Sequence, residues 1–336
     1  MCVRSKKELC YENVPSFPLT LFCRCVTLHF TESENRSVSI QDEISALKRE
    51  RNAIILAHNY QPGEVQDIAD FTGDSLELAR KAATVSEDVV VFCGVHFMAE
   101  TAAILNPRKT VLIPTPDAGC PMADMITGDQ LRGLKAKHPS AKVLCYVNST
   151  AEIKAESDCC VTSSNALDVA RAYPADQEII FVPDQHLGAF TAERLGREFI
   201  LWPGYCPTHA WMTEGQIRLA RAAHPGAPVL MHPECPKPVR DAADHVLSTG
   251  GICNYARESG APLFIIGTET GILHRLQKEN PEKTFVPLLE SAICPNMKKT
   301  TLEKVLWSLR DNETVVTVPE PVASRARRAI ESMLAI

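Results

Sequence analysis

The chain lacks three features that would assign it to a special class. No apolar run approaches the length needed to cross a bilayer, so we expect no membrane span. Lys and Arg number 35 against 41 Asp and Glu, a net charge of −6 that disfavours a nucleic-acid surface. No signal peptide is evident, because Arg24 interrupts the apolar stretch 17–30 and no small-residue cleavage site follows. We therefore expect a soluble cytoplasmic protein with neither nucleic acid nor membrane as a partner.

Cysteine, in contrast, is abundant, with 13 residues in a chain of 336. A secreted disulfide framework is not expected, because the chain is long, the count is odd and no leader is evident. In a reducing compartment, some of these thiols would instead hold metal. A chain of this length also suggests two or three domains.

Three Cys-Pro dipeptides recur at a near-constant interval. Cys120, Cys206 and Cys294 are separated by 86 and by 88 positions. A threonine stands seven residues after each cysteine, and capping-box sequences open the helices predicted there, at Thr127, Thr213 and Thr300. One supersecondary pattern therefore occurs three times, with one cysteine at the same place in each copy.

Apolar strands alternate with amphipathic helices from residue 39 onward, which is typical of parallel sheets covered on both faces. The repeat is too long for a solenoid. We predict an α/β fold of three pseudo-symmetric α/β/α units, with triplicated parallel sheets around a central cluster. The predicted parts are an N-terminal extension, three α/β units and a helix-strand-helix tail: 1–36, 37–120, 121–206, 207–294 and 295–336.

The two ends of the chain depart from this pattern. Residues 1–36 show no periodicity, and we expect a disordered or wrongly assigned extension. A second metal site at Cys23, Cys25 and His29 is the alternative for this part. In the tail we predict a helix over 301–311, a strand over 314–318 and a helix over 320–334.

Polar triplets follow the first strand of each unit, where ligands of open parallel α/β sheets bind. They are His58-Asn59-Tyr60, Tyr146-Val147-Asn148 and His232-Pro233-Glu234. Turns at Ser75, Ser163 and Thr249 offer hydroxyls and backbone N–H groups to phosphate or carboxylate. Each of these residues could also be a simple cap or packing residue.

Glu234 is harder to explain as a structural residue, because it stands between two prolines. A carboxylate in a site poor in water would have a raised pKa and would suit acid/base work. Tyr60 and Tyr146 could also move protons.

Three widely spaced cysteines suit an iron–sulfur cluster with one iron lacking a protein ligand better than structural zinc. An open iron is a Lewis acid and assists loss of water. Cys235 also precedes a proline but is out of phase with the trio, whereas Cys93 and Cys145 lie in apolar strands as core residues.

Long motifs in residues 40–336 resemble the quinolinate synthase family, the bacterial enzymes of de novo NAD (pyridine nucleotide) biosynthesis. The matching stretches include AHNYQPGEVQDIADFTGDS, YVNSTAEIKAESDCCVTSSNA and HPECPKPVRDAADHVLSTGG, at 57–75, 146–166 and 232–251. The resemblance implies a triplicated α/β fold around a 4Fe-4S cluster. It also implies a transferase that condenses iminoaspartate (iminosuccinate) with dihydroxyacetone phosphate to quinolinate, phosphate and water, with L-aspartate oxidase as a possible partner that supplies the imine.

The resemblance also implies roles for particular residues. The cluster ligands would be Cys120, Cys206 and Cys294. The catalytic candidates would be Glu234, Tyr60, His58 and Tyr146. Iminoaspartate would be held by His58, Ser75, Tyr146, Val147, Asn148, Ser163, His232, Pro233, Glu234 and Thr249.

Two alternatives to this function stay open at the level of sequence. One is another hydro-lyase on a three-cysteine 4Fe-4S cluster, and the other is a non-enzymatic iron–sulfur sensor. A redox switch of the Cys-x-x-Cys-x-x-Cys type, present in some family members, is not supported here, since the chain reads Cys-Pro-Asn-Met from Cys294.

Overall fold

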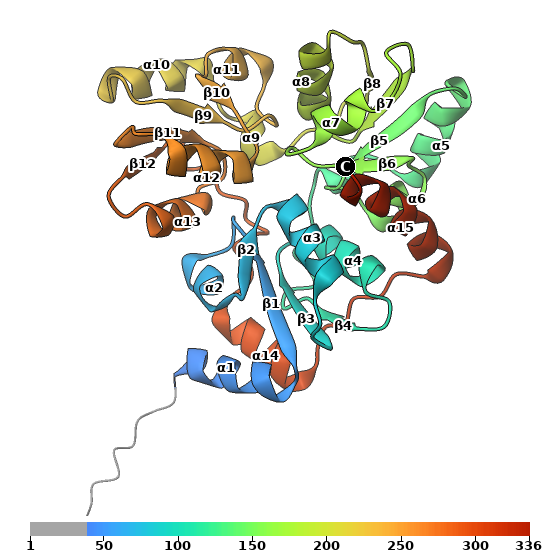
Figure 1. Cartoon of the computed structure of the whole chain (residues 1–336), viewed down its shortest axis with the longest axis vertical. Helices are drawn as coiled ribbons and strands as arrows, with labels where there is room; N and C mark the ends of the chain where they lie inside the picture. The colour runs from blue at the N-terminus through green and yellow to red at the C-terminus, as the bar shows by residue number, and fades with distance from the viewer. Residues whose placement is uncertain (1–38) are drawn as a thin grey trace, which may run out of the picture. The chain divides into compact units, whose positions relative to one another are not determined.

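The computed structural model describes residues 39–336. The predictions for the extension 1–36, including a metal site at Cys23, Cys25 and His29, lie outside the described residues. Within residues 39–336 the strands form three four-stranded sheets, and every pairing between neighbouring strands is parallel (Figure 1).

The three sheets share one strand order, in which the second strand of the unit lies at the edge and the first lies next to it. The first sheet runs β2 (Phe71–Gly73), β1 (Ala53–His58), β3 (Val89–Cys93) and β4 (Thr110–Leu112). The second runs β6 (Cys159–Val161), β5 (Lys142–Tyr146), β7 (Ile179–Val182) and β8 (Ile200–Leu201). The third runs β10 (His245–Val246), β9 (Val229–Met231), β11 (Leu263–Gly267) and β12 (Thr284–Pro287). This repetition confirms the predicted fold class, while the predicted unit boundaries stay a prediction.

Helices connect the strands and cover the sheets. In the first unit they are α1 (Ile40–Glu50), α2 (Gly63–Ile68), α3 (Ser75–Thr84) and α4 (His96–Leu105). The second unit has the short 3₁₀ helix η1 (Ala123–Met125), α5 (Gly128–Lys137), α6 (Ala151–Ala155), α7 (Ala166–Arg171) and α8 (Gln185–Leu195). The third has α9 (Pro207–Ala210), α10 (Glu214–Ala223), α11 (Lys237–Asp241), α12 (Thr249–Glu258) and α13 (Ile272–Glu279).

Sequence signals explain where several of these helices begin. Thr127 and Thr213 each accept a hydrogen bond from the backbone of the glutamine three residues later, which confirms both predicted capping boxes. The helix near Thr300 instead begins one residue later, because the Thr301 side chain accepts from the backbone N–H of Lys304. The predicted box at Thr300 is therefore wrong.

The C-terminal tail contains α14 (Leu302–Asp311) and α15 (Glu320–Leu334), close to the two predicted helices. Helix α14 packs on α1, and α15 packs on α6 and β6 of the second unit. The predicted strand at 314–318 is wrong. Val315 forms only an isolated antiparallel bridge to Leu112, so this segment pairs too briefly with the edge of the first sheet to make a strand.

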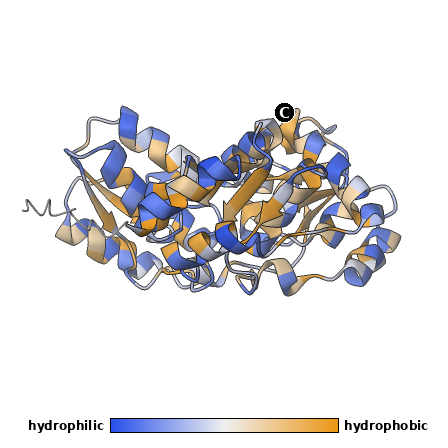
Figure 2. Cartoon of the chain, turned by 90° about the horizontal axis from the view of Figure 1, so that it is seen from below, coloured by the Kyte–Doolittle hydropathy of each residue, from blue (hydrophilic) through white to orange (hydrophobic). Residues whose placement is uncertain are grey.

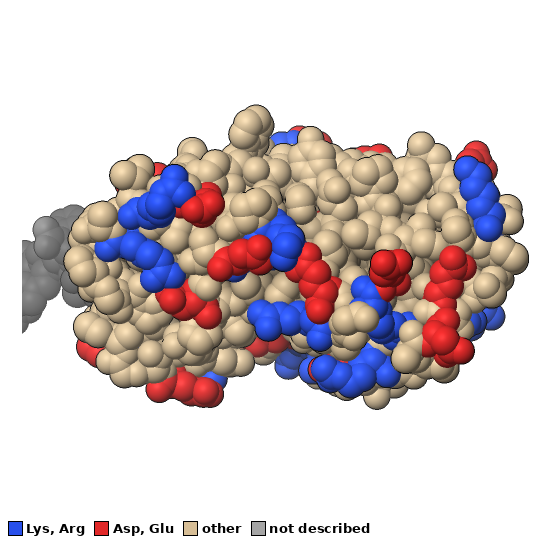
Figure 3. All heavy atoms as spheres, turned by 90° about the horizontal axis from the view of Figure 1, so that it is seen from above, with Lys and Arg blue, Asp and Glu red and all other residues tan. Residues whose placement is uncertain are grey.

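The strands are the most apolar elements, and the helices turn apolar residues toward them (Figure 2). All six residues of β1 and all five of β3 are buried, as expected for a sheet covered on both faces. On the face shown in Figure 3, acidic and basic side chains are interspersed. No helix within residues 39–336 is both long and apolar enough to cross a membrane.

Candidate active site

The carboxyl ends of the three sheets open into one shared cavity. Parallel sheets of all three units end there, which is where this architecture binds ligands. Twelve of the predicted site residues line the cavity: His58, Tyr60, Ser75, Cys120, Tyr146, Asn148, Ser163, Cys206, His232, Glu234, Thr249 and Cys294. Val147 and Pro233 are buried beside it and do not line it. The placement brings the predicted residues together, and their catalytic and binding roles remain predictions.

Two of the strand-end triplets repeat the same local turn. The backbone N–H of Tyr60 donates to Nδ1 of His58 at 3.1 Å, and the backbone N–H of Glu234 donates to Nδ1 of His232 at 3.4 Å. An accepting Nδ1 leaves the ring proton on Nε2. In His232 this Nε2 lies 3.2 Å from the hydroxyl of Ser163.

Burial keeps both histidines neutral. Desolvation lowers the pKa of His58 to about 3, with the nearby charge of Lys298 as a further cause. Desolvation likewise lowers the pKa of His232 to about 3. Both rings therefore act near neutral pH as hydrogen-bonding groups and not as cations.

A series of close polar contacts joins the two buried tyrosines; three are hydrogen bonds, and the fourth is the close approach of His209 to Glu234. The hydroxyl of Tyr146 donates to Oε1 of Glu234 at 2.5 Å, and Oε2 of Glu234 lies 2.7 Å from Nδ1 of His209. On the other side of the ring, Nε2 of His209 lies 2.8 Å from Oγ1 of Thr268. Oγ1 of Thr268 is in turn 2.6 Å from the hydroxyl of Tyr60.

The polarity of this chain follows from the carboxylate. If the Nδ1–H of His209 donates to Glu234, then Nε2 accepts from the Thr268 hydroxyl, and Thr268 accepts from Tyr60. A carboxylate that orients an imidazole, which in turn accepts from a hydroxyl, is the arrangement that activates nucleophiles in hydrolases. The same arrangement here can draw a proton away from Tyr60.

Glu234 differs from the prediction of a raised pKa. Burial favours the neutral acid, but the electrostatic contributions of His209 and His232 and the hydrogen bond from Tyr146 outweigh burial, so the pKa of Glu234 is lowered. The carboxylate is therefore ionised although its side chain is only 4% exposed. The prediction was wrong because it considered desolvation without a partner.

The tyrosines are shifted in the opposite direction. Burial and the negative charge of Glu234 raise the pKa of Tyr60 and of Tyr146 well above the usual value. Both phenols are therefore protonated at rest. A phenolate at Tyr60 would exist only while its proton resides on His209, which it reaches through the hydroxyl of Thr268.

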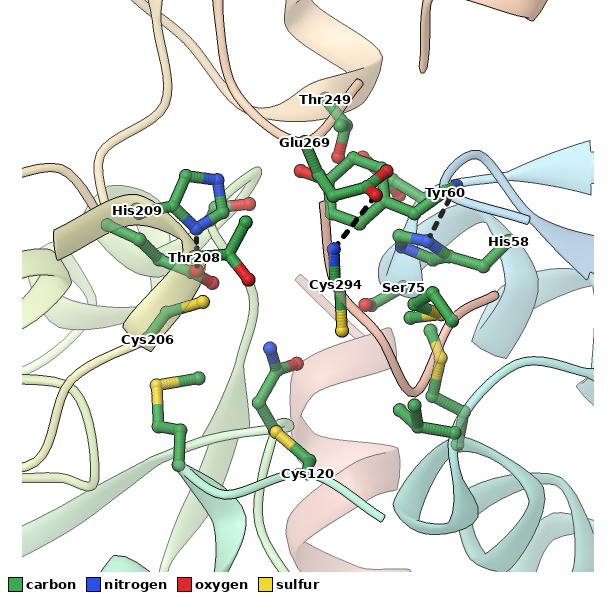
Figure 4. A pocket seen from close by; sticks show the side chains of 18 of the residues that line it. His58, Tyr60, Ser75, Cys120, Cys206, Thr208, His209, Thr249, Glu269 and Cys294 are labelled. Atoms are coloured by element: carbon green, nitrogen blue, oxygen red, sulfur yellow. Dashed lines mark hydrogen bonds and ion pairs between the residues drawn. The ribbon is translucent and has the colours of Figure 1, made fainter. Parts of the chain in front are cut away.

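Figure 4 shows that Cys120, Cys206 and Cys294 come from three separate segments and surround one space. Cys120 precedes η1, Cys206 is the N-cap of α9, and Cys294 lies between β12 and α14. Cys235 is fully buried next to Met212 and does not line the cavity. Its exclusion agrees with its out-of-phase position in the sequence.

The three cysteines fit a cluster of several metal atoms better than a single ion. Within residues 39–336 the only set of three metal-binding atoms that lie within 4.8 Å of one another belongs to Cys206, His209 and Glu234. The 2.7 Å distance between Nδ1 of His209 and Oε2 of Glu234 accounts for one of the three distances in that set. The three sulfur atoms do not all lie within 4.8 Å of one another, and an iron–sulfur cluster holds its thiolates apart.

Burial raises the pKa of the three cysteine thiols. Desolvation raises the pKa of Cys120 to about 12, and it also raises the pKa of Cys206 and Cys294. Thiolates bind metal, so loading of the site must release protons. A positively charged metal centre would stabilise the deprotonated sulfurs.

Hydroxyls and helix N-termini form one wall of the cavity. Ser75 and Thr249 are the first residues of α3 and α12, and Ser163 lies just ahead of α7. Backbone N–H groups at the start of a helix favour anions. This wall therefore offers a suitable place for carboxylate or phosphate groups.

Sequence reasoning missed several residues of the site. His209, Thr208 and Glu269 line the cavity, and Thr268 links Tyr60 to His209 through two hydrogen bonds. Two signals were available. His209 stands three residues after Cys206, within the helix that this cysteine caps, and Thr268 directly follows Gly267, one of the positions in register among the three units.

Comparisons with known proteins agree with this geometry. The family model described as "Quinolinate synthetase A protein" matches residues 42–335. A quinolinate synthase of Dehalococcoides mccartyi is 57% identical over 297 residues, which cover 88% of this chain and 98% of that protein. Quinolinate synthases of Thermodesulfovibrio yellowstonii and Thermus thermophilus are each 52% identical, over 90% of this chain and 99% and 98% of those proteins.

Fold and site together define the class: an α/β protein of three repeated units whose shared cavity combines three thiols with a series of buried titratable side chains. Within that class the match is specific. The chain belongs to the quinolinate synthase family of NAD-biosynthetic enzymes.

Proposed function

We propose that this enzyme condenses iminoaspartate with dihydroxyacetone phosphate and releases quinolinate, phosphate and two molecules of water. The observation that carries the proposal is the series of contacts that links the side chains of Tyr60 and Tyr146. These contacts lie at the same cavity as the three in-phase cysteines. A sensor would not need such a chain. The family membership supports the choice of substrates.

The cavity contains suitable groups for an anionic imine. Ser75, Ser163 and Thr249 present hydroxyls, and α3 and α12 present backbone N–H groups. Neutral His58 and His232 add N–H donors without adding charge. We assign iminoaspartate to this wall, together with Asn148 and the buried backbone at Val147 and Pro233.

The linked side chains from Tyr60 to Tyr146 supply the proton transfers. Each ring closure and each loss of water requires a proton to leave carbon or nitrogen and a proton to reach a departing oxygen. Tyr60 passes its proton through Thr268 to His209, whose cationic form Glu234 stabilises. Tyr146, bound to the other oxygen of Glu234, is placed to return a proton.

Cys120, Cys206 and Cys294 are the residues that would hold a 4Fe-4S cluster. When bound, such a cluster supplies one iron without a protein ligand, and this Lewis acid helps hydroxide to depart. The three thiols and the lack of a fourth in-phase cysteine support this assignment.

The direct test is an anaerobic assay with iminoaspartate, generated in place by L-aspartate oxidase, our proposed physiological source of the imine. Quinolinate should form only when dihydroxyacetone phosphate is also present. A hydro-lyase would release water without the triose phosphate. Iron-loaded enzyme that makes no quinolinate from both substrates would overturn the proposal.

A further inference from the structure

The three candidate ligand cysteines are anchored in different ways. Cys206 caps α9, and the carbonyl of Cys120 accepts a backbone hydrogen bond at the start of η1. Cys294 lies in the long connection 288–301 between β12 and α14, where the backbone N–H groups of Asn296 and Met297 bind its sulfur. A further contact fixes the backbone of Cys294 itself.

That contact is the carboxylate of Glu269, which follows β11 and whose side chain is 1% exposed. Oε1 accepts the backbone N–H of Cys294 at 3.0 Å, and Oε2 accepts the backbone N–H of Gly271 at 2.7 Å. Figure 4 shows Glu269 and Cys294 joined in this way on one side of the cavity. A buried carboxylate with two charge-assisted hydrogen bonds holds its partners strongly.

Lys298 neutralises this buried charge. Its Nζ lies 2.9 Å from Oε1 of Glu269 and also donates to the backbone carbonyl of Tyr60. Lys298 is part of the same connection as Cys294, so the ion pair ties this loop to both the third and the first unit. Gln61 adds a second tie, because its side-chain amide donates to the carbonyl of Met297 at 2.9 Å.

The atoms around the ion pair of Glu269 and Lys298 are tightly packed. A Cβ added at Gly271 would lie 2.6 Å from Nζ of Lys298, 2.7 Å from the carbonyl oxygen of Tyr60 and 2.8 Å from Oε2 of Glu269. Only glycine lets these three groups approach each other so closely. The arrangement is thus specific and not the chance position of a flexible lysine.

We propose that Glu269, with Lys298 as its counter-charge, is a positioning residue that sets the place of the Cys294 thiolate and couples it to Tyr60. The inference rests on the proposed cluster, since it assigns Cys294 a metal to hold. Glu269 acts on the loop backbone. Loss of its carboxylate should therefore affect metal retention before it affects the overall fold.

The test compares Glu269→Ala and Glu269→Gln with the wild type and with Glu290→Gln, an exposed position in the same connection. We expect Glu269→Ala to lose iron to a chelator about 10-fold faster than the wild type, the lower end of the effect of outer-shell partners on metal affinity. Glu269→Gln keeps an accepting oxygen but not the charge, and should lie between the two. Glu290→Gln should match the wild type.

A second readout does not depend on the cluster. In the full chain after iron removal, alkylation of Cys294 should be faster in Glu269→Ala than in the wild type, while alkylation of Cys120 should be unchanged. If Glu269→Ala keeps wild-type iron retention and wild-type alkylation of Cys294, the positioning role is wrong. If the wild-type protein takes up no cluster, that result contradicts the proposed function instead. The alkylation rates then still test whether Glu269 positions Cys294.

Discussion

At the scale of single residues, Glu234 is the centre of the acid–base chemistry that we propose. Its two carboxylate oxygens bind different partners, Tyr146 on one side and His209 on the other. Removal of its charge would leave His209 without the group that fixes its tautomer and stabilises its cation. A neutral amide of the same shape tests this role cleanly.

In Glu234→Gln, turnover should fall by roughly 10²–10⁴, the usual range for loss of acid–base function. The cluster should survive, because Glu234 is not one of the proposed ligands. Rates of quinolinate formation and iron content per chain would be measured side by side, with Glu290→Gln as the control. Near-normal turnover would reduce Glu234 to a structural residue.

The neutral histidines predict a pH dependence of stability. The unfolded chain binds protons at histidine near pH 6.5, whereas folded His58 and His232 bind them only near pH 3. Between these values the unfolded state holds more protons, so the free energy of unfolding decreases as the pH falls. The limiting slope is about 1.4 kcal/mol per pH unit for each histidine.

Urea unfolding of cluster-free protein at pH 7 and pH 5 measures this effect. The double variant His58→Asn, His232→Asn should show a flatter pH dependence than the wild type. Equal slopes in both proteins would mean that these histidines are not kept neutral in the fold.

At the scale of elements, the ends of strands and the loops after them supply the side chains to which we assign the chemistry. Thr268, directly after β11, connects Tyr60 of the first unit to His209 in α9. Its hydroxyl is the only group between the two. The link between Tyr60 and His209 therefore depends on one buried hydroxyl oxygen at the end of β11.

Thr268→Val keeps the shape of this residue but removes that oxygen. We expect turnover to fall by about 10²-fold or more, since Tyr60 loses its route to His209. Thr270→Val is the matched control, because Thr270 binds Ala292 through its backbone and not its side chain. Similar activity in the two variants would show that the proton leaves Tyr60 by another path.

The elements also show what the sequence could and could not predict. The pattern of apolar strands and capping residues predicted the parallel sheets. The recurrence of Cys-Pro predicted that the three cysteines would lie close together. The isolated bridge at Val315 was predicted as a strand, because local pattern does not reveal how many partners a segment finds. His209 was missed because only the tertiary fold places its ring beside Glu234.

At the scale of the whole molecule, one side chain joins all three units. Asp74 caps α3 of the first unit with Oδ1, and its Oδ2 accepts from the hydroxyl of Ser164 at 2.7 Å and from the backbone N–H of Gly250 at 3.3 Å. These partners belong to the second and third units. The cavity wall formed by Ser75, Ser163 and Thr249 is thus tied together next to where we place the substrate.

The threefold repeat is also the reason for the cysteine assignment. Each unit contributes one in-phase cysteine to the shared cavity, whereas Cys235 has no equivalent and packs against Met212 outside it. The central claim is that these three residues, and not the other buried thiols, hold the metal centre on which the activity depends.

The most direct measurement of this claim is iron content and quinolinate formation in four variants purified without oxygen. Cys120→Ala, Cys206→Ala and Cys294→Ala should each lose the visible absorbance of the cluster and all activity, while Cys235→Ala should keep both. A colourless Cys235→Ala protein, or a brown and active Cys206→Ala protein, would contradict the account.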